Sequence, residues 1–212
     1  MRTPACAAAL ALAAASLAAQ TRPRAALGAE GAWLRLHGQV GATRETLRGP
    51  ALAGDGRLTF GRIVLGAGYL EARLEPDGGT ARPRDLVEGR AFLGAEPWPW
   101  LSVTAGPMLR AYVTDPATER WVLWQARARV QGPLLRTTLA TYVELWRALS
   151  SRVNLPDAVD RVQGGEAGVV YRPPRVSLWM RLAYRIDDAA LGRGYRGETV
   201  EALSLTVGVG GR

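Results

Sequence analysis

Cysteine, histidine, lysine and long apolar runs are all scarce or missing in this chain. Cys6 is the only cysteine, and it lies in an N-terminal segment that we expect to be removed. The mature chain would then have no disulfide and no cysteine metal ligand. His37 is the only histidine, so a metal site would have to rely on carboxylates. We therefore expect no metal and no other cofactor.

The absence of lysine leaves arginine as the only basic residue. The chain has 27 basic residues against 19 acidic ones, a formal net charge of +8. The arginines form neither a run nor a stripe at helical spacing, which are the patterns expected of a nucleic-acid-binding surface. We therefore expect no nucleic-acid partner.

Apolar runs long enough for a spanning helix are also missing. The longest run, Cys6 to Leu17, follows Arg2 and precedes the small residues Ala18 and Ala19. This is the pattern of a secretory signal peptide, and the run is shorter than the roughly 20 residues of a membrane-spanning helix. We expect a signal peptide at 1–19, a lead-in without periodicity at 20–31 and a single domain at 32–212.

From Trp33 onward, apolar residues recur at every second position. In Leu101 to Val113 all odd positions are apolar, while the even positions are mostly small, polar, charged or aromatic. Successive side chains of a β-strand point to opposite faces, so this alternation indicates strands with one apolar face.

Ten such strands are expected, separated by glycine- and proline-rich turns. Short connections alternate with longer ones, and the longest are Ser150–Asp160 and Asp188–Gly197. Two chain ends on one side of a barrel require an even number of strands, so eight or twelve are the alternatives to ten. The ten expected strands are 33–43, 51–60, 63–75, 85–95, 100–114, 119–131, 134–149, 161–172, 176–187 and 198–210.

Alternation alone does not say which face meets water. A soluble periplasmic barrel would turn its apolar face inward, whereas a transmembrane barrel turns it toward lipid. The length of the strands and the alternation of short and long connections favour the membrane. So do Trp98, Trp100 and Tyr171 near strand ends, where interfacial aromatic residues gather.

With these features the chain resembles bacterial outer-membrane β-barrel proteins as a class, from about Trp33 to Gly210. The resemblance implies an all-β, antiparallel transmembrane β-barrel in a Gram-negative outer membrane. It also implies outer-membrane lipid, including lipopolysaccharide, and the barrel-assembly machinery as partners. One departure is the C-terminus, which ends Val207-Gly208-Val209-Gly210-Gly211-Arg212, whereas such barrels usually finish on an aromatic residue.

If the apolar face meets lipid, the opposite face lines a lumen rich in charge. Isolated charges are costly in so narrow a space, so we expect arginine–carboxylate pairs that close it. Arg35, Arg73, Glu119 and Asp187 are also expected to point inward. The expected network consists of Arg90, Arg110, Arg127, Arg129, Arg136, Arg181, Arg185, Glu71, Glu88, Glu144 and Glu166.

The preferred function is therefore a structural or surface-interaction role with a closed lumen, without enzymatic activity. The alternatives are a narrow anion-favouring channel, a soluble periplasmic ligand-binding barrel and an outer-membrane lipid hydrolase. The hydrolase would pair an inward His37 with one of three serines. The three serines are Ser102, Ser177 and Ser204. As a separate expectation, Arg193 and Arg196 lie in an external loop, where they could contact lipopolysaccharide phosphates.

Overall fold

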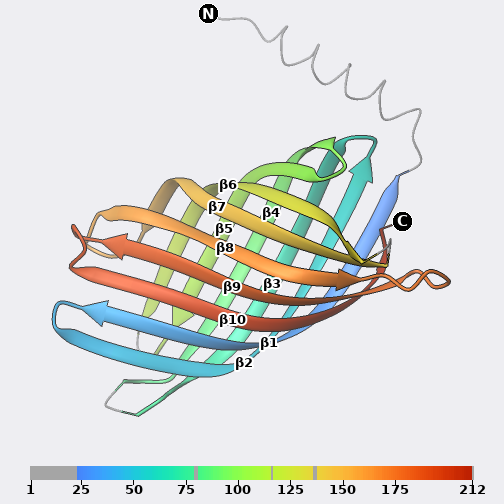
Figure 1. Cartoon of the computed structure of the whole chain (residues 1–212). Helices are drawn as coiled ribbons and strands as arrows, with labels where there is room; N and C mark the ends of the chain where they lie inside the picture. Colours follow the sequence, from blue (N-terminus) through green and yellow to red (C-terminus); the bar gives the residue numbers. More distant parts are fainter. Residues whose placement is uncertain (1–22, 79–80, 116, 136–137, 212) are drawn as a thin grey trace, which may run out of the picture.

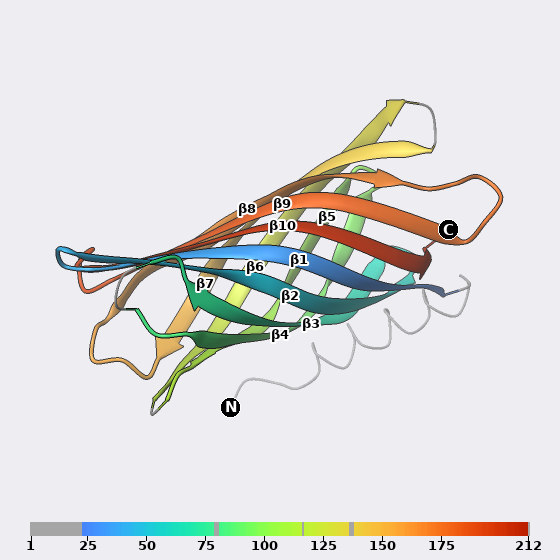
Figure 2. The same cartoon turned by 90° about the horizontal axis from the view of Figure 1, so that it is seen from below.

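The computed structural model describes residues 23–78, 81–115, 117–135 and 138–211. Ten antiparallel strands pair with their sequence neighbours, and β10 pairs with β1 to close a barrel (Figures 1 and 2). The predicted all-β, ten-stranded antiparallel barrel is thus confirmed. The strands are β1 Arg24–Val40, β2 Thr43–Phe60, β3 Ile63–Pro76, β4 Arg84–Trp98, β5 Leu101–Val113, β6 Thr118–Leu135, β7 Leu139–Val153, β8 Val159–Tyr171, β9 Leu178–Leu191 and β10 Arg196–Gly210.

The two ends of the barrel are distinct. The start of β1, the end of β10 and the connections β2–β3, β4–β5, β6–β7 and β8–β9 form one end, called here the terminal rim (Figure 1). The other five connections form the distal rim. Gly41 and Gly61 open the tight β1–β2 and β2–β3 turns with φ of 58° and 59°, a conformation that glycine adopts without steric cost. Within the described ranges, no helix is long and apolar enough to cross a bilayer.

Several strands are longer than expected, which corrects the connections between them. The lead-in expected at 20–31 is wrong from Arg24 onward, because these residues form the first half of β1 and pair with both β2 and β10. Strand β2 begins at Thr43 rather than near Ala51, and its pairing with β3 skips Gly49 and Pro50. The expected signal peptide lies outside the described residues.

The connections at the distal rim are shorter than the sequence suggested. Strands β7 and β8 reduce the expected Ser150–Asp160 loop to residues 154–158, and β9 and β10 reduce Asp188–Gly197 to residues 192–195. The strands extend because inward apolar residues such as Leu191 and Val200, both fully buried, continue the alternation close to the rim.

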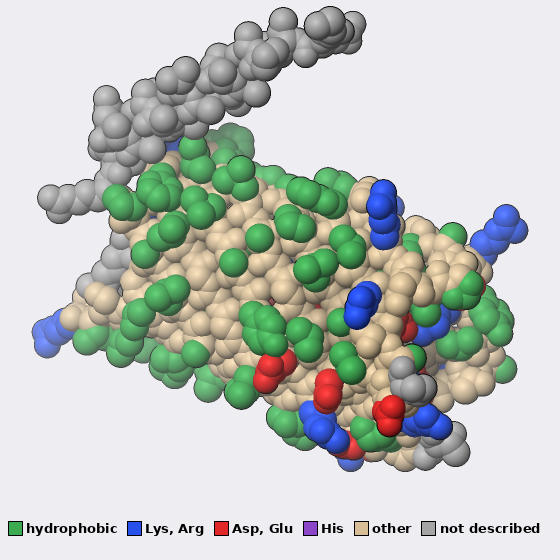
Figure 3. Space-filling model, turned by 180° about the vertical axis from the view of Figure 1, so that it is seen from behind, with side chains coloured by type: hydrophobic (Ala, Val, Ile, Leu, Met, Phe, Trp, Pro, Cys, Tyr) green, Lys and Arg blue, Asp and Glu red, His purple; other side chains and the backbone are tan. Residues whose placement is uncertain are grey.

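The apolar residues change face along some strands. In β1, Leu27 and Trp33 are exposed on the outside, whereas Leu34 and Leu36 are fully buried inside. In β3, Leu65 is outside and Leu74 is inside. On the face seen in Figure 3, apolar side chains cover the half near the terminal rim and most charged side chains gather toward the distal rim. In these two strands the apolar side chains therefore point outward near the terminal rim and inward near the distal rim.

This change of face corrects four inward assignments. Arg35, His37, Glu71 and Arg73 lie on the exposed outer face of β1 and β3, not in the lumen. The sequence interpretation placed the leucines on the opposite face of these strands against lipid. In the structure these leucines, Leu34, Leu36 and Leu74, point into the barrel and are fully buried. A shift of apolar residues by one position moves every side chain to the other face.

All ten strands contribute to an apolar cluster inside the barrel, called here the distal plug. Its largest side chains include Trp121, Tyr112 and Trp146, which are almost fully buried. The plug consists of Leu34, Leu36, Leu47, Ala51, Leu70, Ala72, Leu74, Leu86, Met108, Tyr112, Trp121, Leu123, Trp146, Val162, Ala189, Leu191, Val200 and Ala202.

Candidate functional site in the barrel interior

Arg110 on β5 connects opposite walls of the barrel. Its Nε donates to Glu88 Oε1 at 2.7 Å, across the neighbouring pair of strands. Its Nη2 donates to Asp187 Oδ2 on β9 at 2.6 Å, and its Nη1 lies 3.5 Å from Glu198 Oε1 on β10. The Arg110 side chain is only 4% exposed. One guanidinium therefore links carboxylates from three strands in the middle of the lumen.

Arg185 and Trp146 complete this central group. Arg185 Nη1 donates to Glu88 Oε2 at 3.1 Å, and its Nη2 lies 3.4 Å from Asp187 Oδ2. Trp146 Nε1 donates to Asp187 Oδ1 at 3.0 Å, while the Tyr112 hydroxyl donates to Glu198. The buried carboxylates are thus paired or hydrogen-bonded, as burial of charge requires.

A second set of pairs lies nearer the terminal rim. Arg127 Nη1 donates to Glu144 Oε1 at 2.6 Å, and Arg181 Nη2 donates to Glu30 Oε2 at 2.7 Å. Arg181 also lies 3.5 Å from Asp55. Together with the central group, these pairs lie in the lumen between the distal plug and the terminal rim.

Not every predicted member of the network has the expected partner. The structure places Arg90 and Arg129 inside, but neither has a carboxylate within ion-pair distance among the described residues. The Arg129 guanidinium instead lies 3.6 Å from the centre of the Tyr142 ring. Glu166 accepts a hydrogen bond from the Tyr142 hydroxyl rather than pairing with the arginines expected to converge on it. Arg136 lies outside the described residues.

The sequence interpretation missed Glu30, Asp55 and Glu198 as lumen residues. Glu30 fell in the expected lead-in, although Leu27, Ala29 and Gly31 around it already alternate as an outward set. Glu198 was placed at the start of the last strand, next to an expected loop. In the structure β1 begins earlier, at Arg24, and places Glu30 on its inward face. Strand β10 begins at Arg196 and places Glu198 on its inward face near the distal rim.

The serine–histidine pair of the hydrolase alternative does not form between His37 and Ser204. His37 is on the outer face, 44% exposed at its side chain, and its Nε2 lies 3.8 Å from Glu201 Oε2. Ser204 is buried on the inward face of β10, so the barrel wall separates the two side chains. Among the described residues, no cluster of histidine, cysteine and carboxylate side chains could hold a metal ion.

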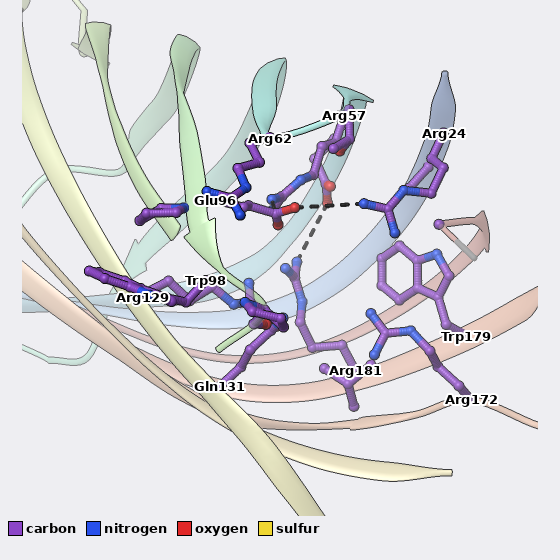
Figure 4. Close-up of a pocket in the computed structure, with 18 residues that line it drawn as sticks. Arg24, Arg57, Arg62, Glu96, Trp98, Arg129, Gln131, Arg172, Trp179 and Arg181 are labelled. Atoms are coloured by element: carbon purple, nitrogen blue, oxygen red, sulfur yellow. Dashed lines mark hydrogen bonds and ion pairs between the residues drawn. The ribbon is translucent and has the colours of Figure 1, made fainter. Parts of the chain in front are cut away.

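An interior space opens at the terminal rim and is called here the vestibule (Figure 4). Its volume is about 610 Å³. Its wall contains two carboxylates, Asp55 and Glu96, and the indoles of Trp98 and Trp179. Its wall also contains six arginines, which are Arg24, Arg57, Arg62, Arg129, Arg172 and Arg181.

The three aromatic residues predicted at the membrane interface all lie at this rim. Trp98 and Trp100 stack with ring centres 5.5 Å apart and planes 10° apart, and each is about half exposed. Tyr171 ends β8 with an exposed side chain. Trp98 also lines the vestibule, so it borders the mouth of the barrel, and the interfacial role of the three stays a prediction.

Comparisons with known proteins show likeness to solved outer-membrane barrels. The translocator domain of the autotransporter NalP from Neisseria meningitidis has 13% sequence identity and a TM-score of 0.48, with 97% of each chain covered. An outer-membrane channel from Pseudomonas putida F1 has 11% identity and a TM-score of 0.47, covering 90% of this chain and 97% of that one. The attachment invasion locus protein Ail of Yersinia pestis has 11% identity and a TM-score of 0.40, covering 90% of this chain and all of that one.

No family model matches the sequence. No curated protein matches it either.

Proposed function

We propose that this chain is an outer-membrane β-barrel with a structural or surface-interaction role and a closed interior. The distal plug carries this proposal, because apolar side chains from all ten strands fill the space that a through-channel would need. Such a filled interior is typical of small barrels.

The exterior supports a membrane location. Large apolar side chains point outward and are highly exposed, for example Leu52 at 70%, Leu93 at 62% and Leu145 at 64%. Exposed apolar surface of this extent marks a membrane or protein contact in a stable protein. Spanning strands need roughly 9–11 residues, so strands such as the 18-residue β2 extend beyond the bilayer.

The change of face fits one side of that membrane. Near the terminal rim the exterior is apolar and meets lipid, whereas near the distal rim outward charges such as Arg48 and Asp77 form ion pairs suited to water. The start of β1 and the end of β10 lie at the terminal rim, which is the periplasmic side in the class of proteins that the chain resembles. The distal rim would then face the cell exterior.

Outer-membrane lipid is the partner that this exterior supports best. Arg193 is exposed in the β9–β10 turn and is free to meet lipopolysaccharide phosphates. Arg196 is not, because it turns inward and donates to Glu119 Oε2 at 2.7 Å. Recognition by the barrel-assembly machinery stays a prediction.

Fractionation tests the membrane location. Full-length protein expressed with its N-terminal segment should appear in the outer-membrane fraction, require detergent for extraction and change gel mobility on heating. A product that stays soluble in the periplasm without detergent would favour the soluble-barrel alternative and refute the proposal.

Planar-bilayer recording tests the closed interior. We expect no steady conductance from the wild-type protein. A reproducible anion-selective conductance that decreases in Arg127→Ala, but not in the exterior control Arg147→Ala, would establish the channel alternative instead. Arg127 is a suitable probe because it lies in the lumen beside Glu144, whereas Arg147 on the next strand is exposed outside.

A further inference from the structure

We propose that the vestibule at the terminal rim binds a small anion that carries two or more phosphate or carboxylate groups. The charge of its wall motivates this inference, since six arginines face two carboxylates. The site is separate from the ion pairs of the central lumen, and its existence does not depend on which way the barrel is oriented.

The carboxylates of the wall are already engaged. Glu96 pairs with Arg57 and lies 3.9 Å from Arg24, while Asp55 lies 3.5 Å from Arg181. Glu30, deeper in the lumen, also pairs with Arg181. These contacts account for three of the six arginines.

The other three arginines lack an acidic partner among the described residues. Arg62 lies in the β2–β3 turn, Arg129 on β6 and Arg172 just after β8, so they approach the space from different parts of the wall (Figure 4). The Nε of Arg129 is buried without a hydrogen-bond partner. Burial lowers the pKa of Arg172, and the nearby charges of Arg129 and Arg57 lower it further. An anion in the vestibule would relieve the repulsion between these charges and provide acceptors for the guanidinium groups.

The chemistry of arginine defines the class of ligand. A guanidinium offers a planar fork of donors that matches the two oxygens of a carboxylate or phosphate. Three such groups on separate parts of the wall favour an anion with more than one charged group over a monovalent one. The volume of about 610 Å³ is in the range of pockets for small organic molecules, and Trp98 and Trp179 add an apolar surface.

The vestibule is closed at its inner end. Arg127 and Arg181 border two smaller spaces of about 40 and about 70 Å³ that lie between the vestibule and the distal plug, and Arg129 borders the second of them. A ligand therefore enters and leaves through the terminal rim. If the proposed orientation holds, the ligand comes from the periplasm.

Isothermal titration calorimetry on the detergent-solubilised full chain tests the proposal, with pyrophosphate and citrate as probes. We expect saturable binding of at least one, weakening as sodium chloride is raised because salt screens the charges. Binding of pyrophosphate alone identifies a phosphate site, binding of citrate alone a carboxylate site, and binding of both a general polyanion site. Absence of saturable binding by either probe overturns the proposal.

A pair of matched variants separates the vestibule from general surface charge. Arg62→Gln/Arg172→Gln removes two exposed rim arginines, and we expect affinity to fall at least tenfold. Arg152→Gln/Arg193→Gln removes the same charge from exposed positions near the distal rim and should leave affinity unchanged. Equal affinities in the wild type and the vestibule variant, or equal losses in both variants, would refute the site. Heat-modifiable gel mobility verifies that each variant is folded.

Discussion

Replacing Arg110 by methionine should destabilise the barrel far more than the same replacement at Arg161. Both arginines have a carboxylate oxygen at 2.6 Å, Asp187 for Arg110 and Asp188 for Arg161. The Arg110 side chain is 4% exposed, whereas that of Arg161 is 49% exposed. The pair of variants thus holds the substitution and the shortest ion-pair distance constant, and it changes the burial and the number of carboxylate partners.

The expected magnitudes differ because of desolvation. Removing one partner from a buried ion pair leaves an uncompensated charge and costs about 3–5 kcal/mol. Arg110 contacts Glu88, Asp187 and Glu198. In the Arg110→Met variant, Glu88 and Asp187 would still have Arg185 as a partner, whereas Glu198 would keep only the hydrogen bond from the Tyr112 hydroxyl. An exposed pair contributes about 0–1 kcal/mol, because water solvates both charges when they separate.

Urea unfolding of protein refolded into lipid vesicles, followed by tryptophan fluorescence, measures both values. At 1.4 kcal/mol for each factor of ten, the loss at Arg110 corresponds to roughly 10²–10⁴ in the folding equilibrium. A free energy of unfolding that falls by less than about 1 kcal/mol in both variants would refute the view that the central group stabilises the barrel. A partial recovery in Arg110→Met/Glu198→Gln, which removes the orphaned charge, would support it.

Four other substitutions, one of them a control, are tested by the same unfolding measurement, with lipid analysis added for His37→Ala. Gly49→Ala should lower the free energy of unfolding by about 1–3 kcal/mol, because a Cβ there would lie 1.9 Å from the Arg73 carbonyl oxygen. The control Gly31→Ala has nothing within 4 Å of the added Cβ and should not show this clash. Equal effects of the two variants would contradict the close approach at Gly49. Leu123→Ala should cost about 2–5 kcal/mol by opening a cavity in the distal plug, and a neutral result would show that the plug is loosely packed. His37→Ala should change stability by less than about 0.5 kcal/mol and leave membrane lipid composition unaltered, and loss of a lipid modification in that variant would reveal an enzymatic role.

The alternation of residues was sufficient to predict the class of fold. Strand segments such as Leu101 to Val113 repeat with a period of two, and the turn at Gly61-Arg62 was placed correctly because the alternation restarts after it. These are local properties of the backbone, since adjacent side chains of a strand must point to opposite faces. The strand count followed from the number of such segments.

The direction of each face was not a local property. Arg35 and Glu71 were assigned to the lumen because their strands alternate, but alternation is the same whether leucine points to lipid or to a plug. Only closure of the barrel shows that Leu34 and Leu36 meet apolar side chains from the other strands. The choice depends on what lies across the lumen, which no single strand specifies.

The sequence by itself therefore determined the class of fold, the approximate strand segments and the surplus of arginine, because these depend on periodicity and composition. The tertiary structure alone decided which charges share a site. Arg110 meets Asp187 and Glu198 although they are 77 and 88 residues away in the chain, because a closed barrel places β5 opposite β9 and β10. It also gathered Arg62, Arg129 and Arg172 around one vestibule, since every second connection returns to the same rim.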